Sequence, residues 1–177
     1  MTAKRRRFGT ILLVGFGIAA AQSPPPAIPE ELKPPSTEAV LLRAAGVGKQ
    51  IYSCNASPND PSHFEWVLAR PEADLMNQAG EKIGKHFQGP TWEALDGSQV
   101  VGQVLQRTNA PHAGSIPWLL LKATATHGSG TFSRVTYIQR VNTKGGVAPA
   151  EGCDRSHAGA TASVDYQADY YFYGPRL

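Results

Sequence analysis

The sequence is poor in the residues that most often point to a specific chemistry. With two cysteines in 177 residues, it has too few for a disulfide scaffold or a multi-cysteine zinc site. Charged residues make up 18% and hydrophobic residues 41%, a balance that excludes a disordered or strongly charged chain. Glycine and proline, at 18 and 14 residues, are in contrast abundant, which disfavours a helical bundle. The length suits one domain of ordinary size.

The first residues follow the pattern of a signal peptide. Lys4 to Arg7 are basic, and an apolar run over residues 11–21 ends in three alanines, which favours cleavage after Ala21. A run of about 11 residues is too short for a transmembrane helix, and a retained N-terminal anchor is the alternative. We therefore expect a signal peptide over residues 1–21 and an exported protein, periplasmic or extracellular, with no transmembrane span after cleavage. The pair Arg5-Arg6 also fits a twin-arginine signal, so the export route stays open.

The net charge of the chain depends on this segment. Losing Lys4 to Arg7 lowers Lys+Arg from 17 to 13 against 14 Asp+Glu, so the net charge changes from +3 to −1. A mature chain of that charge has no general attraction for a polyanion. We therefore expect no nucleic-acid partner.

One motif suggests a cofactor but stands in the wrong context. Gly15, Gly17 and Ala20 spell the G-x-G-x-x-A of a dinucleotide-binding turn, which requires a following helix. Six prolines follow between residues 24 and 35 instead, and a helix interior tolerates none of them. We therefore expect no cofactor. The same prolines predict an extended, solvated spacer over residues 22–37, followed by a single β domain over residues 38–177.

The rest of the chain has the pattern of short β-strands. The clearest covers residues 161–173, where one face holds Val164, Tyr166, Ala168, Tyr170 and Phe172. Further strands are expected at residues 49–54, 63–70, 82–87, 91–94, 99–107, 116–126 and 131–141, separated by glycine-rich turns. Only residues 71–78 leave room for a helical turn, with Pro71 at its first position. The pattern predicts an all-β fold, an antiparallel barrel or sandwich of about eight strands with very little helix.

Cys54 and Cys153 are best interpreted as one disulfide, because an exported protein with an even pair of cysteines usually joins them. The alternative is a reactive thiol or a metal ligand, with His157 close to Cys153 in the sequence. The five histidines show neither H-x-H nor H-E-x-x-H spacing. His63 with Glu65 is a weak two-ligand pair, so we expect no metal.

Several segments resemble a known family. They are residues 48–54 (GKQIYSC), 83–93 (IGKHFQGPTWE), 96–102 (DGSQVVG), 116–121 (IPWLLL), 145–149 (GGVAP), 152–154 (GCD) and 170–173 (YYFY). Together they are similar to the secreted bacterial and fungal family catalogued as domain of unknown function 3455, over residues 28–173. The resemblance implies export, a single domain and the disulfide, and it brings no activity with it.

The densest polar cluster lies between His86 and Ser98. In a functional interpretation, Glu93 is a general acid or base, His86 or Asp96 assists it, and Trp92 is a stacking platform for a ligand. In a structural interpretation, Trp92 fills the core while Glu93 or Asp96 holds a turn. Because Trp92 and Glu93 are consecutive in an expected strand, their side chains should point to opposite faces.

Tyr171 and Tyr173 form a second candidate site, on the polar face of the last strand. Aromatic rings beside polar side chains bind sugars and other polar ligands by stacking and hydrogen bonding. If both faces of the sheet are covered, these tyrosines are core residues instead.

These observations favour an exported, single-domain β protein without enzymatic activity, which binds a ligand or belongs to the cell envelope. The expected ligand is a carbohydrate or another polar small molecule. The alternative is a secreted hydrolase that uses a carboxylate in the segment from His86 to Ser98. The chain lacks the G-x-S-x-G motif, which disfavours a serine hydrolase.

Overall fold

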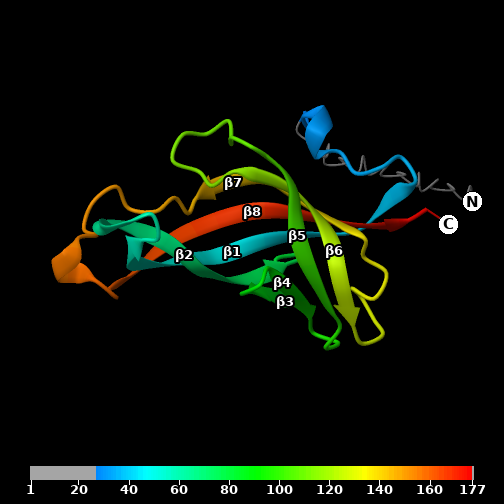
Figure 1. Ribbon diagram of the computed structural model, residues 1–177. Coiled ribbons are helices and arrows are strands. Elements are labelled where there is room, and N and C mark those ends of the chain that lie inside the picture. Colours follow the sequence, from blue (N-terminus) through cyan, green and yellow to red (C-terminus); the bar gives the residue numbers. More distant parts are fainter. Residues whose placement is uncertain (1–26, 177) are drawn as a thin grey trace, which may run out of the picture.

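The computed structural model describes residues 27–176, which form eight antiparallel strands in one closed barrel (Figure 1). The strands are β1 (Glu38–Ser57), β2 (Asp60–Met76), β3 (Lys82–Phe87), β4 (Thr91–Ala94), β5 (Gln99–Thr108), β6 (Trp118–His127), β7 (Tyr137–Gly145) and β8 (Thr161–Pro175). Each strand pairs with the next, and β8 returns to pair with β1. The described part of the chain also has two short 3-10 turns, η1 (Glu30–Leu32) and η2 (Arg155–His157). The predicted all-β fold is confirmed, as a barrel; the predicted signal peptide lies outside the described residues.

Two local features differ from the sequence-based expectations. Residues 71–78, the segment with room for a helical turn, form none, because β2 continues through Met76 with Pro71, Ala73 and Leu75 buried at alternate positions. The proline is tolerated since the β2–β3 ladder begins only at Ala73, which leaves β2 an edge strand before that point.

The strand expected from residue 131 begins only at Tyr137. Thr131 is held in a turn instead, since its N–H and hydroxyl both donate to the carboxylate of Asp96. Ser133 closes this turn, with its N–H 3.1 Å from the carbonyl oxygen of Gly130.

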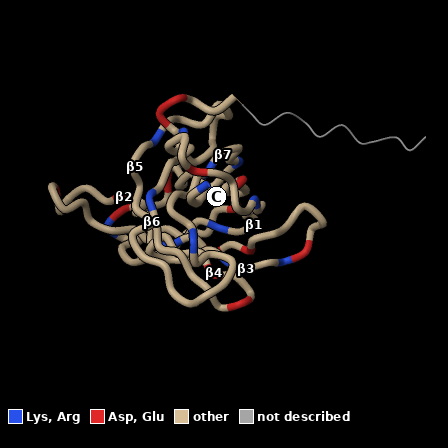
Figure 2. Tube along the Cα trace, turned by 90° about the vertical axis from the view of Figure 1, so that its right-hand side faces the viewer, with Lys and Arg blue, Asp and Glu red and all other residues tan. Residues whose placement is uncertain are grey.

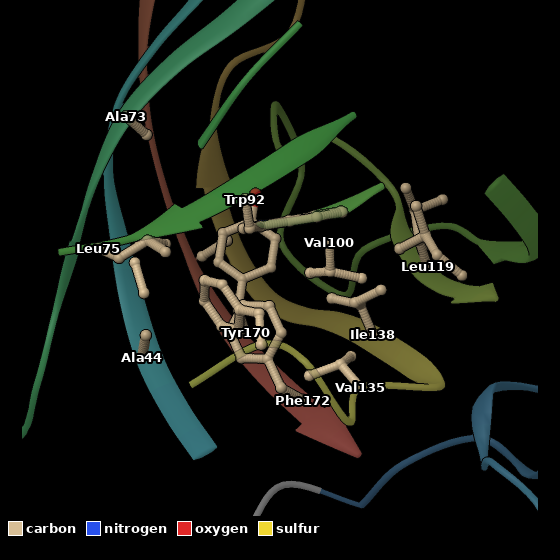
Figure 3. Packing of buried hydrophobic residues seen from close by; sticks show 14 of the residues in the cluster. Ala44, Ala73, Leu75, Trp92, Val100, Leu119, Val135, Ile138, Tyr170 and Phe172 are labelled. Carbon is tan, nitrogen blue, oxygen red and sulfur yellow. The ribbon is translucent and has the colours of Figure 1, made fainter. Parts of the chain in front are cut away.

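Aromatic rings fill the interior of the barrel (Figure 3). Trp92 packs edge-on against Tyr170 and Phe172, with ring centroids 5.6 and 6.0 Å apart. Glycine makes room for these rings on the neighbouring strands. A Cβ atom at Gly46 would lie 2.5 Å from the Tyr170 ring, and one at Gly102 would lie 3.1 Å from the Trp92 ring. The predicted inward face of β8 is confirmed at Tyr166, Ala168, Tyr170 and Phe172.

The proline-rich segment is not fully solvated, contrary to expectation. Leu32 in η1 is completely buried against Trp118, Leu120 and Val141 on the outside of the barrel. Gln139 also donates a hydrogen bond of 2.7 Å to the carbonyl oxygen of Leu32. A buried leucine and a satisfied carbonyl attach the described end of this segment to β6 and β7.

The two shortest strands leave a notch in the barrel wall. β2 pairs with β3 only from Ala73 to Met76, and β5 pairs with β4 only from Gln99 to Val101. Within the described residues, the preceding part of β2 and the following part of β5 have no strand between them. We call this opening the notch; it lies between Leu68–Pro71 of β2 and Val104 and Arg107 of β5, above the turn at Gly89 and Pro90.

Candidate binding notch

The notch holds a cavity of about 260 Å³ that reaches the interior of the barrel. Its sides are the apolar and arginine side chains of β2 and β5, and its floor includes His86, Trp92 and Tyr170. A larger groove of about 630 Å³ runs along the outside of β1 and β8, but much of its lining is exposed surface, such as Val47, His112 and Lys144. The notch is the better candidate because its floor is made of buried aromatic and polar side chains.

The floor of the notch is an aromatic stack. The His86 ring lies flat on Trp92, with centroids 4.4 Å apart and planes 8° from parallel. Tyr170 meets both rings edge-on, at 5.4 and 5.6 Å. All three side chains are buried, so the stack is a fixed surface contributed by β3, β4 and β8.

His86 is a neutral ring in this position. Burial lowers its pKa to about 3, and the charge of Arg140 acts in the same direction, while the hydrogen bond to Thr91 opposes the shift. The Nδ1 atom lies 2.9 Å from the carbonyl oxygen of Thr91, so the single proton of the neutral ring belongs on Nδ1. Nε2 therefore carries a lone pair and can accept a hydrogen bond.

Arg140 of β7 supplies a charge to the same site. Its Nε and Nη2 atoms donate to the carbonyl oxygen of Pro117 at 3.2 and 2.8 Å. Burial raises the pKa of Tyr170, and the nearby guanidinium partly offsets that rise. Among residues 27–176, no carboxylate forms an ion pair with Arg140.

Two buried N–H groups beside the notch lack an acceptor in the described structure. They are Nε2 of Gln50 and Nε1 of Trp92, whose side chains are 2% and 1% exposed and both line the notch. Buried donors usually find a partner, and leaving one unpaired costs about 1–3 kcal/mol. The floor of the notch therefore has more hydrogen-bond donors than its own acceptors satisfy.

The two predicted catalytic carboxylates lie outside the notch. Trp92 points into the barrel and Glu93 points away from it, as their consecutive positions in a strand require. Glu93 binds Lys85 at 2.9 Å and Gln99 at 2.5 Å, contacts that lower its pKa.

Asp96 holds a turn. One carboxylate oxygen accepts from the N–H and hydroxyl of Ser98, and the other accepts from the N–H and hydroxyl of Thr131. These bonds hold the pKa of Asp96 far below its usual range. His86 hydrogen-bonds Thr91 rather than either carboxylate, so the structure does not assemble the proposed acid–base group around Glu93.

Tyr171 and Tyr173 lie on the outer face of β8, away from the notch. Tyr173 donates a 3.2 Å hydrogen bond to Gln139, and Tyr171 packs beside the cluster that covers Leu32. The guanidinium of Arg43 lies 5.4 Å from the Tyr171 ring centre. Both tyrosines are half-buried and contribute to attaching the proline-rich segment.

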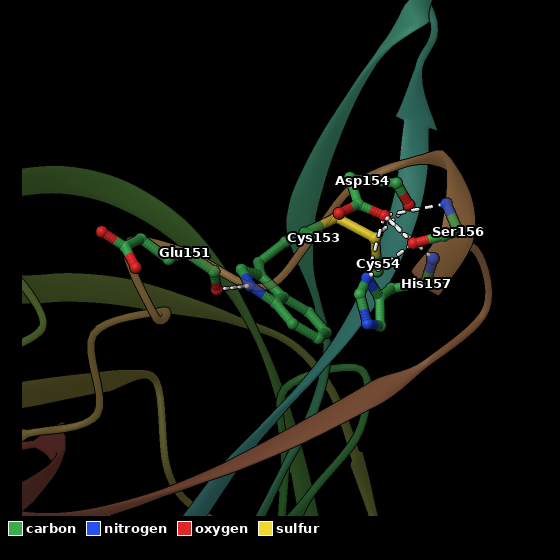
Figure 4. Close-up of a disulfide and its surroundings, with 7 residues drawn as sticks. Cys54, Glu151, Cys153, Asp154, Ser156 and His157 are labelled. Atoms are coloured by element: carbon green, nitrogen blue, oxygen red, sulfur yellow. Dashed lines mark hydrogen bonds and ion pairs between the residues drawn. A yellow bond between two sulfur atoms is a disulfide. The ribbon is translucent and has the colours of Figure 1, made fainter.

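Cys54 and Cys153 form a disulfide at the far end of the β1–β2 hairpin (Figure 4). Beside it lie Asp154, Ser156 and His157. These are the residue types of a hydrolase triad, but their hydrogen bonds do not have the arrangement of one. Asp154 and Ser156 both contact the same atom of His157, Nδ1, at 2.8 and 3.1 Å. A triad needs the carboxylate and the nucleophile on opposite ring nitrogens. Asp154 instead caps η2, and these hydrogen bonds lower its pKa to about 2.

Sequence reasoning missed Arg140 and Gln50. One signal was available for Arg140: it follows Ile138 by two positions, so it shares the inward face of that strand. Lys and Arg positions are interspersed with Asp and Glu positions along the chain trace in Figure 2.

The described residues include no group of three or more His, Cys, Asp or Glu side chains placed to hold a metal ion. Over the same residues, 27–176, no helix is long and apolar enough to cross a membrane. A family model described as "Protein of unknown function (DUF3455)" matches residues 35–174. No curated protein and no solved structure matches the chain.

Proposed function

Because the chain belongs to the family described as "Protein of unknown function (DUF3455)", which supplies no activity, we propose a function from the notch itself: an exported, non-enzymatic domain that binds a small organic ligand there. The match confirms the resemblance seen in the sequence. One observation carries the proposal. A cavity of about 260 Å³ ends on a buried aromatic floor that includes polar groups without partners, and such concave sites with few convergent polar groups are typical of ligand binding.

The site lacks the parts that a hydrolase needs. The notch lining contains neither Asp nor Glu, and Glu93 and Asp96 are held by other partners on the outside of the barrel. His86 has a lone pair on Nε2, but no serine, threonine or cysteine lines the notch for it to activate. The observations therefore favour binding over catalysis.

Export is part of the proposal. The Cys54–Cys153 disulfide is typical of an oxidising compartment. Intact mass spectrometry of protein recovered from the periplasm or medium tests the point. The expected mass begins at Gln22, and a protein that keeps residues 1–21 contradicts the proposal.

Binding at the notch is tested with a blocked variant. Val104 lines the notch and is partly exposed, so Val104→Trp should close the opening without disturbing the core. Leu105, the next residue of β5, is similarly exposed and does not line the notch, so Leu105→Trp is the matched control.

Benzoate, benzamide and glucose serve as probes, measured by calorimetric titration. We expect at least one of the two aromatic probes to bind the wild type and Leu105→Trp, and neither to bind Val104→Trp. Equal binding to all three proteins, or no binding to any, refutes the notch as a ligand site. Glucose binding that Val104→Trp abolishes would identify the ligand as a carbohydrate.

A further inference from the structure

The charges of the notch point to one class of ligand. Three arginines line it, Arg70, Arg107 and Arg140, and no acidic side chain does. Arg70 is already paired, with Nε 2.7 Å from Glu72. Arg107 and Arg140 form no ion pair with any residue of the described chain. Two cations are therefore available, one at the rim and one at the floor.

Arg140 is the more informative of the two because it is half-buried. A cation removed from bulk water loses solvation, and a paired anion recovers much of that loss. The contacts to Pro117 satisfy two N–H groups but leave the charge uncompensated. The neutral His86 ring adds no second charge, so the positive field at the floor comes from arginine.

The hydrogen-bond balance agrees with the charge balance. Gln50 and Trp92, which line the notch together with Arg140, each carry a buried N–H donor that has no partner in the described structure. Neither donor atom is exposed in this structure, so an anion that enters the notch makes its first contact with the arginines. Anionic oxygens are the strongest acceptors for such donors.

We propose that the notch selects small organic anions, with the anionic oxygens directed to Arg140 and Arg107 and an apolar body held between β2 and β5. The inference rests on the proposed function and names its ligand class. Leu68, Pro90 and Val104 supply the apolar sides. The cavity of about 260 Å³ is smaller than the roughly 300–1,000 Å³ of drug-sized sites, which suits a single ring or a short chain.

A matched set of probes tests the anion selectivity. Benzoate and benzamide have nearly the same shape and differ in charge, and phenyl phosphate distinguishes a phosphate ligand from a carboxylate. We expect one of the two anions to bind the wild type about tenfold or more tighter than benzamide, as a charge-assisted contact to arginine requires. The affinity of that anion should also fall as sodium chloride is added.

Variants assign the selectivity to the two arginines. Arg107 is exposed, so Arg107→Gln should fold normally and weaken the anion by at least about threefold while leaving benzamide unchanged. Arg140→Gln should remove most of the preference for the anion, and its fold is checked by circular dichroism. Lys122→Gln removes an exposed cation of β6 that does not line the notch, and it should bind like the wild type.

The outcomes separate this inference from the proposed function. If benzamide binds the notch as tightly as both anions, or if Arg107→Gln leaves the anion affinity unchanged, the anion selectivity is refuted and the notch remains a ligand site. If none of the three probes binds, the selectivity is refuted, and if glucose does not bind either, the site is refuted with it.

Discussion

Acid should destabilise this protein through His86, and the loss begins in a pH range where carboxylates remain mostly ionised. Burial lowers the pKa of His86 from 6.5 to about 3, so the unfolded chain takes up the proton first. The stabilisation from the neutral ring is therefore complete above about pH 6.5 and is lost as the pH falls toward 3. At about 1.4 kcal/mol for each pKa unit, the full loss amounts to about 5 kcal/mol.

A substantial part of this effect can be measured without approaching the acid limit. Between pH 7 and pH 5 the unfolded histidine becomes protonated while the native ring does not, which lowers the free energy of unfolding by about 2 kcal/mol. Glu93 and Asp96, whose pKa values are lowered by hydrogen bonds, stabilise the fold above their unfolded pKa values and lose that contribution only at lower pH. The change in the free energy of unfolding between pH 7 and pH 5 thus reports histidine protonation rather than carboxylate protonation.

The assay is urea unfolding at pH 7, 6 and 5 for the wild type, His86→Phe and His63→Gln. Phenylalanine retains an aromatic ring over Trp92 but cannot be protonated. The fall in the free energy of unfolding between pH 7 and pH 5 should therefore be smaller by about 2 kcal/mol in His86→Phe than in the wild type, whatever the absolute stability of the variant. His63 is exposed, and its replacement should leave the slope unchanged. A His86→Phe slope equal to that of the wild type would show that His86 is not the buried neutral ring described above.

Reducing the Cys54–Cys153 disulfide, which spans 99 residues, should cost about 4–5 kcal/mol in the chain-entropy model, and thiol labelling of the denatured, unreduced protein should find no free thiol. Trp92→Ala should cost about 3–5 kcal/mol through the cavity it leaves, whereas Glu93→Gln should change the melting temperature little; the reverse order would contradict the inward position of the indole. Leu32→Ala should cost about 2–5 kcal/mol and expose the proline-rich segment to protease, and an unchanged cleavage rate would mean that the segment is not attached.

The strands were predictable where local signals agree. In β8, a period of two runs without interruption, and the ends of β3 and β4 are marked by glycine and proline turns, so those bounds follow from the sequence. Residues 131–136 look like the start of a strand, but residues 131–134 form a turn, because Asp96, distant in sequence, binds Thr131. The prolines around Leu32 predicted a solvated spacer, and nothing in the local sequence indicates its hydrophobic contact with β6 and β7.

Only the part of the site that is local in sequence was predictable. His86 and Trp92 are close in sequence and stand out as a polar and aromatic cluster. Gln50 and Arg140 come from β1 and β7, and only closure of the barrel brings them to the same cavity. No spacing rule connects residues that meet through long-range strand pairing. The notch itself depends on the shortness of β3 and β4 relative to β2 and β5.

A small organic anion that enters the notch should contact its buried floor. The indole N–H signals of the three tryptophans report on this directly in a two-dimensional NMR titration with benzoate and phenyl phosphate, assigned with Trp92→Phe. We expect a saturable shift of the Trp92 signal, absent in Val104→Trp, while the signal of Trp66 at the far hairpin stays unchanged. A Trp92 signal that does not move with either compound at saturating concentration, or that moves equally in Val104→Trp, contradicts this expectation.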